Sequence, residues 1–330
     1  MKEETVTDIG EFGCIQRILQ NLIYRPESVK LGAGDDGAVY VTPSGYDQVI
    51  STDTMVEGIH FTRETMHFSD VGYRICSVNF SDMAAMGAEP VAFVLSLALP
   101  RNFAMDDLEN CYHGIRECCR KYRVNLLGGD MTASREGVIL TGTVIGMVPS
   151  DMAVKRSGAG PGDVVFVTGT VGDSAAGLAA IRHQWDEEFP NLTKRHRRPD
   201  AQVGLGKILR EAGATSLNDI SDGLSQELNE IAAASGVGID LDKDKIPLSE
   251  EAVRLGHRLH IEPADWALDG GEDYELAGTI PQKDWEKIKD KWPVTEIGSV
   301  HEKGAGRVFI KSKNDAKVLL IPKGYDHFRV

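Results

Sequence analysis

The alternation of hydrophobic and polar positions predicts short strands and longer helices in the first half of the chain. β-branched runs bounded by Gly, Pro and Ser are typical of strands, and apolar residues three or four positions apart are typical of helices. The predicted strands are 38–42, 48–54, 91–99, 124–130 and 137–148, and the predicted helices are 70–87, with Asp70 as N-cap, and 105–122. Strands and helices of similar weight, without strict β-α-β alternation, indicate an α+β layer.

A Gly- and Ser-rich stretch at 149–163 separates this half from a second unit. We therefore expect two domains, 1–150 and 151–330. The strands predicted in the second domain are 163–169, 214–221, 237–242, 273–280, 294–300, 307–312 and 317–321, and the helices are 172–185, 200–212 and 222–235. The charged, Pro-flanked segment 186–199 is predicted to be a loop whose role the sequence does not reveal.

The composition of the chain indicates which partners and which location to expect. The 330 residues include 50 acidic and 36 basic side chains, which gives a formal net charge of −14. Proteins that coat nucleic acid or anionic membrane depend on dense Lys and Arg, so we expect neither partner. No apolar run is long enough to span a membrane, and the N-terminus does not resemble a signal peptide. The five cysteines are odd in number and form no C-x-x-C, which favours reduced thiols and a cytoplasmic location.

The segment "KLGAGDDGAVY" (30–40) raises a question about phosphate binding. Gly32, Gly34 and Gly37 have the spacing of a phosphate loop, yet Asp35 and Asp36 lie inside it. A dinucleotide fingerprint needs a following helix, whereas the strand "AVYVT" follows here. Walker A and protein-kinase motifs are absent from the sequence. Two carboxylates beside a phosphate therefore call for a cation between them.

Other acidic residues support that interpretation. Asp82 continues the apolar stripe of Val71, Ile75 and Val78, where a carboxylate needs a cation or hydrogen bonds unless the stripe has already ended. Acidic residues also follow apolar segments or glycine pairs at other strand ends: Asp53, Asp130, Asp219, Asp222, Glu272 and Asp273. Each alone could be a turn residue or a helix cap. Together, as hard oxygen donors without His or Cys, they suit Mg²⁺ shared with phosphate oxygens.

Taken together, the motifs of the chain resemble those of one known family. "GAGDDGAV", "STDTMVEGIHF", "VNFSDMAAMGAEP", "LLGGDMTAS", "DISDGLSQEL", "GGEDYEL" and "KGYDHF" resemble the thiamine-monophosphate kinase family, in order and over nearly the whole chain. That family belongs to the superfamily of aminoimidazole ribonucleotide synthetase and selenophosphate synthetase. The resemblance implies a two-domain α+β fold, with an N-terminal sheet-and-helix dimerisation domain that binds Mg²⁺ and ATP. A C-terminal α/β domain would close over nucleotide and substrate.

The resemblance also implies an activity and a set of site residues. ATP would be the co-substrate, and its γ-phosphate would pass directly to thiamine monophosphate in a homodimeric enzyme that binds several Mg²⁺ ions. No residue would act as a covalent catalyst, and Asp53 and Asp130 would support the metal-assisted transfer. The implied Mg²⁺ ligands are Asp36, Ser51, Thr52, Asp53, Asp82, Asp130, Asp219 and Asp222. The implied ATP contacts are Tyr112, Gly129, Asp130, Arg156 and Ser221, and the implied contacts to thiamine monophosphate are His60, Glu272 and Tyr325.

Two other functions stay open. The chain could be another ATP-using member of the superfamily, although Cys14 is followed by "IQRI" and lacks the lysine context of a selenophosphate synthetase. It could also be a non-catalytic sensor of Mg-nucleotide, although such a protein would not need so many acidic residues. Met131 stands after "GGD", where the family commonly has Thr. His60 also has a purely structural alternative, in which its ring simply packs under Phe61.

Overall fold

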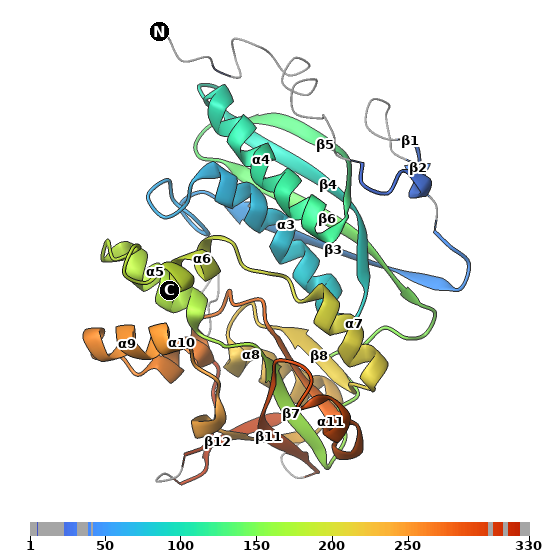
Figure 1. Ribbon diagram of the computed structural model, residues 1–330, viewed down its shortest axis with the longest axis vertical. Coiled ribbons are helices and arrows are strands. Elements are labelled where there is room, and N and C mark those ends of the chain that lie inside the picture. Colours follow the sequence, from blue (N-terminus) through green and yellow to red (C-terminus); the bar gives the residue numbers. More distant parts are fainter. Residues whose placement is uncertain are drawn as a thin grey trace. The chain divides into compact units, whose positions relative to one another are not determined.

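The computed structural model describes Thr5 and residues 23–31, 39–40, 42–302, 306–312 and 316–323. The chain divides into two compact units (Figure 1). Unit 1 comprises residues 1–83 and 88–151, and unit 2 comprises residues 84–87 and 152–330.

Unit 1 is built on a four-stranded sheet with the order β3-β6-β4-β5. β6 pairs antiparallel with β3 and β4, and β4 pairs parallel with β5. The strands are β3 (Tyr46–Val56), β4 (Glu89–Pro100), β5 (Asn125–Ser134) and β6 (Ile139–Pro149). A 3₁₀ turn, η1 (Pro26–Ser28), and an antiparallel pair, β1 (Val29–Leu31) and β2 (Val39–Tyr40), lie outside this sheet.

Two helices, α3 (Phe68–Ala85) and α4 (Met105–Tyr122), cover one face of this sheet (Figure 1). They approach each other so closely that two glycines are required. A Cβ atom added at Gly72 would lie 1.8 Å from the carbonyl oxygen of Cys111, and one added at Gly114 would lie 1.8 Å from that of Ser69. The side chains that face the sheet form the core of unit 1.

The opposite face of the sheet carries no helix of unit 1 among the described residues. Side chains alternate along β3, because successive residues of a strand point to opposite faces. Ser51 and Asp53 are half-buried on the helix-covered face, whereas Thr52 is exposed on the other face and Ile50 there is 64% exposed.

Unit 2 contains a seven-stranded sheet with the order β13-β12-β9-β11-β7-β10-β8. Only the pair of β9 and β12 is parallel. The strands are β7 (Asp163–Thr168), β8 (Ser216–Asp219), β9 (Gly238–Asp242), β10 (Leu276–Pro281), β11 (Val294–His301), β12 (Arg307–Lys311) and β13 (Val318–Leu319). Every residue of β7 is buried, so apolar side chains pack against both faces of the sheet.

The helices of unit 2 form two layers and a satellite group. α8 packs Leu228 and Ile231 with Val165 on one face of the sheet, and α7 and α11 pack with Phe166 on the other. α5, α6 and α9 share a smaller apolar cluster. The bounds are α5 (Asp173–Arg182), α6 (Pro190–Arg197), α7 (Val203–Ala212), α8 (Leu224–Ser235), η2 (Lys243–Lys245), α9 (Glu250–Leu259), α10 (Pro263–Asp269) and α11 (Gln282–Ile288).

The two-domain α+β fold is confirmed, with several local differences from the predicted elements. The segment 186–199 is not simply a loop, because it contains α6, in which Leu192 and His196 are buried one turn apart while charged residues surround them. The short helices α10 and α11 were not predicted. Asp70 is the third residue of α3 and not its N-cap. Within the described part of the chain, none of the helices combines the length and apolarity that a membrane crossing requires.

Candidate active site

Two acidic residues of unit 1 lie on the helix-covered face of the sheet. Asp53 extends from β3, and Asp82 lies in the last part of α3, where its Oδ2 accepts a hydrogen bond of 2.5 Å from the hydroxyl of Ser51. Asn79, one turn before Asp82, accepts the Asp53 backbone N–H at 3.2 Å and donates to the Ile75 carbonyl at 2.8 Å. The structure thus brings Ser51 and Asp82 into direct contact on the face that also carries Asp53. The roles of the three as metal ligands stay predictions.

Thr52 does not join this group. Its hydroxyl donates to the Gly142 carbonyl at 2.7 Å and accepts from the Thr143 hydroxyl at 3.1 Å. Since it lies between Ser51 and Asp53 on an extended strand, its side chain points to the uncovered face.

Gly129 and Asp130 lie on β5, at the other edge of the sheet from β3. In the pairing, Asp53 is opposite Gly142, Gly142 is opposite Leu95, and Leu95 is opposite Gly129. Three strand spacings therefore separate Asp53 from Gly129, which is about 14 Å between the backbones. Asp130 lies beside Ser96, on the uncovered face, and is exposed. Within unit 1 the structure does not bring Asp130 to Asp53.

Gly129 has a packing role of its own. A Cβ atom at this position would lie 1.8 Å from the Leu95 carbonyl oxygen. The glycine of the "GGD" motif therefore lets β4 and β5 approach each other, apart from any contact with a nucleotide.

His60 lies in the loop that follows β3. Its Nδ1 accepts the Val56 backbone N–H at 3.0 Å, and its own N–H donates to the Val56 carbonyl at 3.0 Å. With Nδ1 occupied as an acceptor, the neutral ring carries its proton on Nε2, where it can donate to an anion. The ring is half-buried and its orientation is fixed by backbone, which is more than simple packing under Phe61.

In unit 2, several polar groups at the end of β8 and in the turn after it donate hydrogen bonds to the buried carboxylate of Glu227. Asp219 ends the strand and is 5% exposed. Glu227, in the first turn of α8, accepts the Asp222 N–H at 3.1 Å and the Ser221 hydroxyl at 3.3 Å, and Asn218 donates to its other oxygen. Burial, followed by the charge of Asp219, raises the pKa of Glu227 to about 8.

Glu227 was missed by the sequence analysis, although the signal was available. Glu227 is a carboxylate on the apolar side of α8, which Leu224, Leu228 and Ile231 form. Asp82 has the same kind of position on α3. Glu227 fixes the turn that carries Ser221 and Asp222, and in that way it supports the predicted site residues.

Arg156 reaches the same turn. Its Nε donates to the Asn218 side-chain oxygen at 3.0 Å, and its Nη1 lies 3.2 Å from Glu230 Oε2. The side chain is 57% exposed, so the guanidinium keeps donors that a phosphate oxygen can accept.

The "GGEDYEL" segment separates into one accessible and two structural carboxylates. Asp273 is buried and accepts the N–H groups of Gly172 and Ser174 at 2.6 and 3.0 Å, so it caps the start of α5. Burial raises the pKa of Asp273 to about 8, against the effect of those two donors. Glu275 is buried and forms an ion pair of 2.8 Å with Arg195.

Glu272 is the accessible member of this segment. It adopts a positive φ of 61°, which is uncommon for a residue with a side chain. Its N–H donates to the Ser221 carbonyl at 2.7 Å, and its Oε2 lies 4.0 Å from Nδ1 of the buried His196. The backbone thus links the predicted substrate residue Glu272 to the turn that carries Ser221 and Asp222.

The remaining predicted residues fall into two groups. Tyr112 is 5% exposed on α4, and burial raises the pKa of its hydroxyl, so its contact with ATP stays a prediction. Asp35, Asp36 and Tyr325 lie outside the described residues. Among the residues that are described, no group of three or more His, Cys, Asp or Glu side chains is arranged to hold a metal ion.

Comparison with models of known protein families identifies the class of protein to which this chain belongs. The model of the AIR synthase related protein N-terminal domain matches residues 34–148, and that of the C-terminal domain matches residues 160–326. These two matches together cover most of the chain, which is therefore a two-domain AIR synthase-related protein.

Individual proteins and structures that are similar to this chain identify the family within that class. The thiamine-monophosphate kinase of Bacillus subtilis is 37% identical, over 97% of this chain and 100% of its own. The crystal structure of the thiamine-monophosphate kinase from Stenotrophomonas maltophilia has a TM-score of 0.81 at 32% identity, covering 93% of this chain and 98% of that chain. The structure of AaThiL complexed with AMPPCP and TMP has a TM-score of 0.78 at 31% identity, covering 99% and 100%. The chain belongs to the thiamine-monophosphate kinase family, which confirms the resemblance of its motifs.

Proposed function

We propose that this protein transfers the γ-phosphate of ATP to thiamine monophosphate and so forms thiamine diphosphate. The observation that carries the proposal is the whole-chain likeness to AaThiL complexed with AMPPCP and TMP, over 99% of this chain at 31% identity. We take AMPPCP as the counterpart of ATP, and TMP as the acceptor.

The donor chemistry of the acidic residues fits Mg²⁺, which prefers carboxylate, hydroxyl and phosphate oxygens and keeps part of its water. Ser51 and Asp82 are in direct contact on the face that also carries Asp53. Because the described residues form no closed group of three acidic ligands, phosphate oxygens and water would complete the coordination. When bound, Mg²⁺ supplies positive charge between the two phosphates. We assign several ions to these ligands: Asp36, Ser51, Thr52, Asp53, Asp82, Asp130, Asp219 and Asp222.

The substrate contacts follow from the same proposal. Ser221, in the turn after β8, and Arg156, which contacts Asn218 of β8, would bind ATP, together with Tyr112, Gly129 and Asp130. His60, Glu272 and Tyr325 would contact thiamine monophosphate. His60 acts here as a hydrogen-bond donor through Nε2, because Nδ1 already accepts the Val56 N–H.

The transfer is proposed to be direct. The acceptor phosphate is already ionised at neutral pH, so no general base is needed, and phosphoryl transfer depends mainly on positioning and charge neutralisation. One in-line displacement inverts the configuration at phosphorus. Transfer of a chiral γ-thiophosphate with retention, or a stable phosphoenzyme, would contradict the direct route.

We further propose a cytoplasmic homodimer that pairs the uncovered sheet faces of unit 1. Ile50 extends from that face and is 64% exposed, and a two-fold contact would bury the same patch on both subunits. The cytoplasmic assignment is supported by Cys76, Cys111, Cys118 and Cys119, which are buried and form no disulfide bond among the described residues.

ADP release with ATP, Mg²⁺ and a panel of phosphorylated acceptors tests this function. We expect acceptor-dependent release with thiamine monophosphate and little with the rest of the panel. Release with a different acceptor alone would favour another ATP-using member of the superfamily. Tight ATP binding without release would favour a nucleotide sensor.

A further inference from the structure

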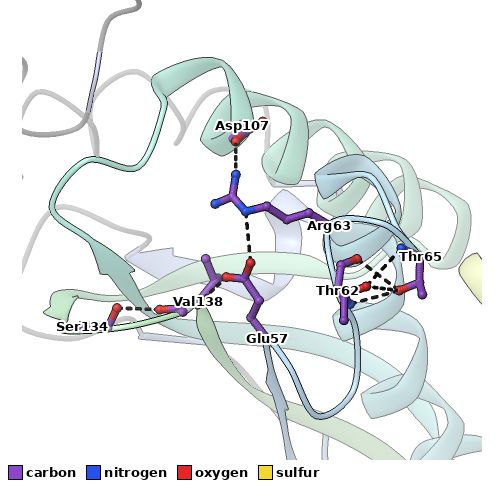
Figure 2. A network of polar contacts seen from close by, with 8 residues as sticks. Glu57, Thr62, Arg63, Thr65, Asp107, Ser134 and Val138 are labelled. Carbon is purple, nitrogen blue, oxygen red and sulfur yellow. Dashed lines mark hydrogen bonds and ion pairs between the residues drawn. The ribbon is translucent and has the colours of Figure 1, made fainter.

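The loop between β3 and α3 carries His60 and is closed by an arginine. Arg63 Nε donates to Glu57 Oε1 at 3.0 Å, and its Nη1 donates to Asp107 Oδ2 at 3.3 Å (Figure 2). The Arg63 guanidinium therefore joins Glu57, at the start of the loop, to Asp107 of α4. His60 lies between Glu57 and Arg63 in the sequence.

Aromatic rings hold the same guanidinium from another side. Its central carbon lies 5.0 Å from the ring centre of Phe68 and 5.7 Å from that of Phe103. These rings contact each other edge to face at 4.9 Å. Exposed ion pairs alone hold a side chain weakly, but two carboxylates and two rings act together on the Arg63 guanidinium.

Glu57 extends the restraint into the sheet. Its Oε2 accepts the Val138 N–H at 2.9 Å, and its own N–H donates to the Val138 carbonyl at 2.9 Å (Figure 2). Within the loop, Gly58 donates to the Phe61 carbonyl at 2.7 Å. Both ends of the loop are thus tied, one to the strand region beside β6 and the other to α4.

We infer that Arg63 is a positioning residue for the acceptor phosphate, because it holds the His60 loop in the orientation that presents Nε2. The inference rests on the proposed function, in which His60 contacts thiamine monophosphate. Arg63 itself does not touch the substrate. Without it, the backbone bonds of His60 to Val56 remain, but the loop loses its connection to α4.

The inference makes a specific kinetic prediction. Arg63→Ala should raise KM for thiamine monophosphate about tenfold, because displacement of a binding group weakens substrate positioning, while kcat and KM for ATP stay within about twofold. In a His60→Ala background, Arg63→Ala should cause no further rise, since the group that it positions is absent. Arg63→Lys, which cannot join both carboxylates, should be intermediate.

Arg258→Ala is a control of the same kind, because Arg258 also combines an ion pair, with Glu188 at 2.6 Å, and a ring contact, 3.6 Å from the Trp185 ring centre. It should leave KM for thiamine monophosphate unchanged. Equal effects of the two arginine variants, or additive effects of Arg63→Ala and His60→Ala, would overturn the inference. If Arg63→Ala fails to fold, Asp107→Asn removes one arm of the contact and should raise the same KM.

An NMR measurement separates this inference from the proposed function. In the substrate-free protein, the His60 side-chain resonance should shift or broaden in Arg63→Ala and stay unchanged in Arg258→Ala. An unchanged His60 signal in Arg63→Ala would overturn the positioning role, whatever the substrate is. A wild-type protein that does not turn over thiamine monophosphate would instead refute the proposed function.

Discussion

Asp82→Asn should make the metal-free protein more stable and the enzyme nearly inactive. The amide keeps the shape of the carboxylate, and its oxygen can still accept the hydrogen bond that Ser51 donates at 2.5 Å. The substitution therefore removes a charge and little else.

The magnitude follows from the position of Asp82 on the sheet. Ser51 and Asp53 are two residues apart on the same face of β3, which is about 7 Å along a strand, so the Asp82 and Asp53 carboxylates are separated by a distance of that order. Two like charges about 7 Å apart repel by about 2 kcal/mol at an effective dielectric constant of about 20. Both groups are half-exposed, and screening reduces this to about 1 kcal/mol. For a chain of 330 residues the melting temperature should then rise by about 1–2 °C.

Calorimetry in the presence of a chelator and turnover with Mg-ATP test the two effects on the same variant. Turnover should fall by about 100-fold, because a charge that positions the metal is lost. Ser51→Ala is the control: it removes the donor, leaves both charges, and should lower the melting temperature. If Asp82→Asn lowers the melting temperature and keeps turnover, Asp82 is a structural residue and the reasoning is wrong.

Three other changes probe separate parts of the molecule. Gly129→Ala should cost about 3 kcal/mol of unfolding free energy, because its Cβ would lie 1.8 Å from the Leu95 carbonyl oxygen; an unchanged denaturation midpoint would contradict the close approach of β4 and β5. Burial raises the pKa of Asp273 in the folded protein to about 8, from an ordinary value of 3.8. Between these values only the folded state binds the proton, so the free energy of unfolding falls as pH rises. Asp273→Asn should remove up to about 1.4 kcal/mol per pH unit of that slope, and an identical slope would refute the assignment. Ile50→Asp should convert the proposed dimer to a monomer in light scattering, and a wild-type monomer would contradict the interface.

Local patterns were sufficient to predict some elements of the fold. The predicted helix 105–122 coincides with α4, whose buried residues follow one stripe. The stripe of α3 predicts that Asp82 needs a polar partner, and Ser51 donates a hydrogen bond to it; its role as a metal ligand stays a prediction. α6 was missed because its buried residues are only Leu192, Thr193 and His196 within a densely charged segment. Three such positions, of which only Leu192 is apolar, do not define an apolar periodicity.

The arrangement of the site depended on information that is not local. The face on which Asp130 lies is set by the register of β4 with β5, which shifts between Phe93 and Val94, and a shift of one residue moves a side chain to the other face. Similarly, "GGEDYEL" does not indicate which acidic residue is accessible. That depends on the start of α5 and on Arg195, which lie far away in the sequence and occupy Asp273 and Glu275.

The central claim is that this chain phosphorylates thiamine monophosphate at the expense of ATP. Phosphorus NMR of a reaction containing the purified protein, Mg²⁺, ATP and thiamine monophosphate tests it directly. The signal of the monophosphate should be replaced by the coupled pair of thiamine diphosphate, in amounts equal to the ADP formed. Loss of ATP to inorganic phosphate with the monophosphate signal unchanged, or no change in any signal, would contradict the account.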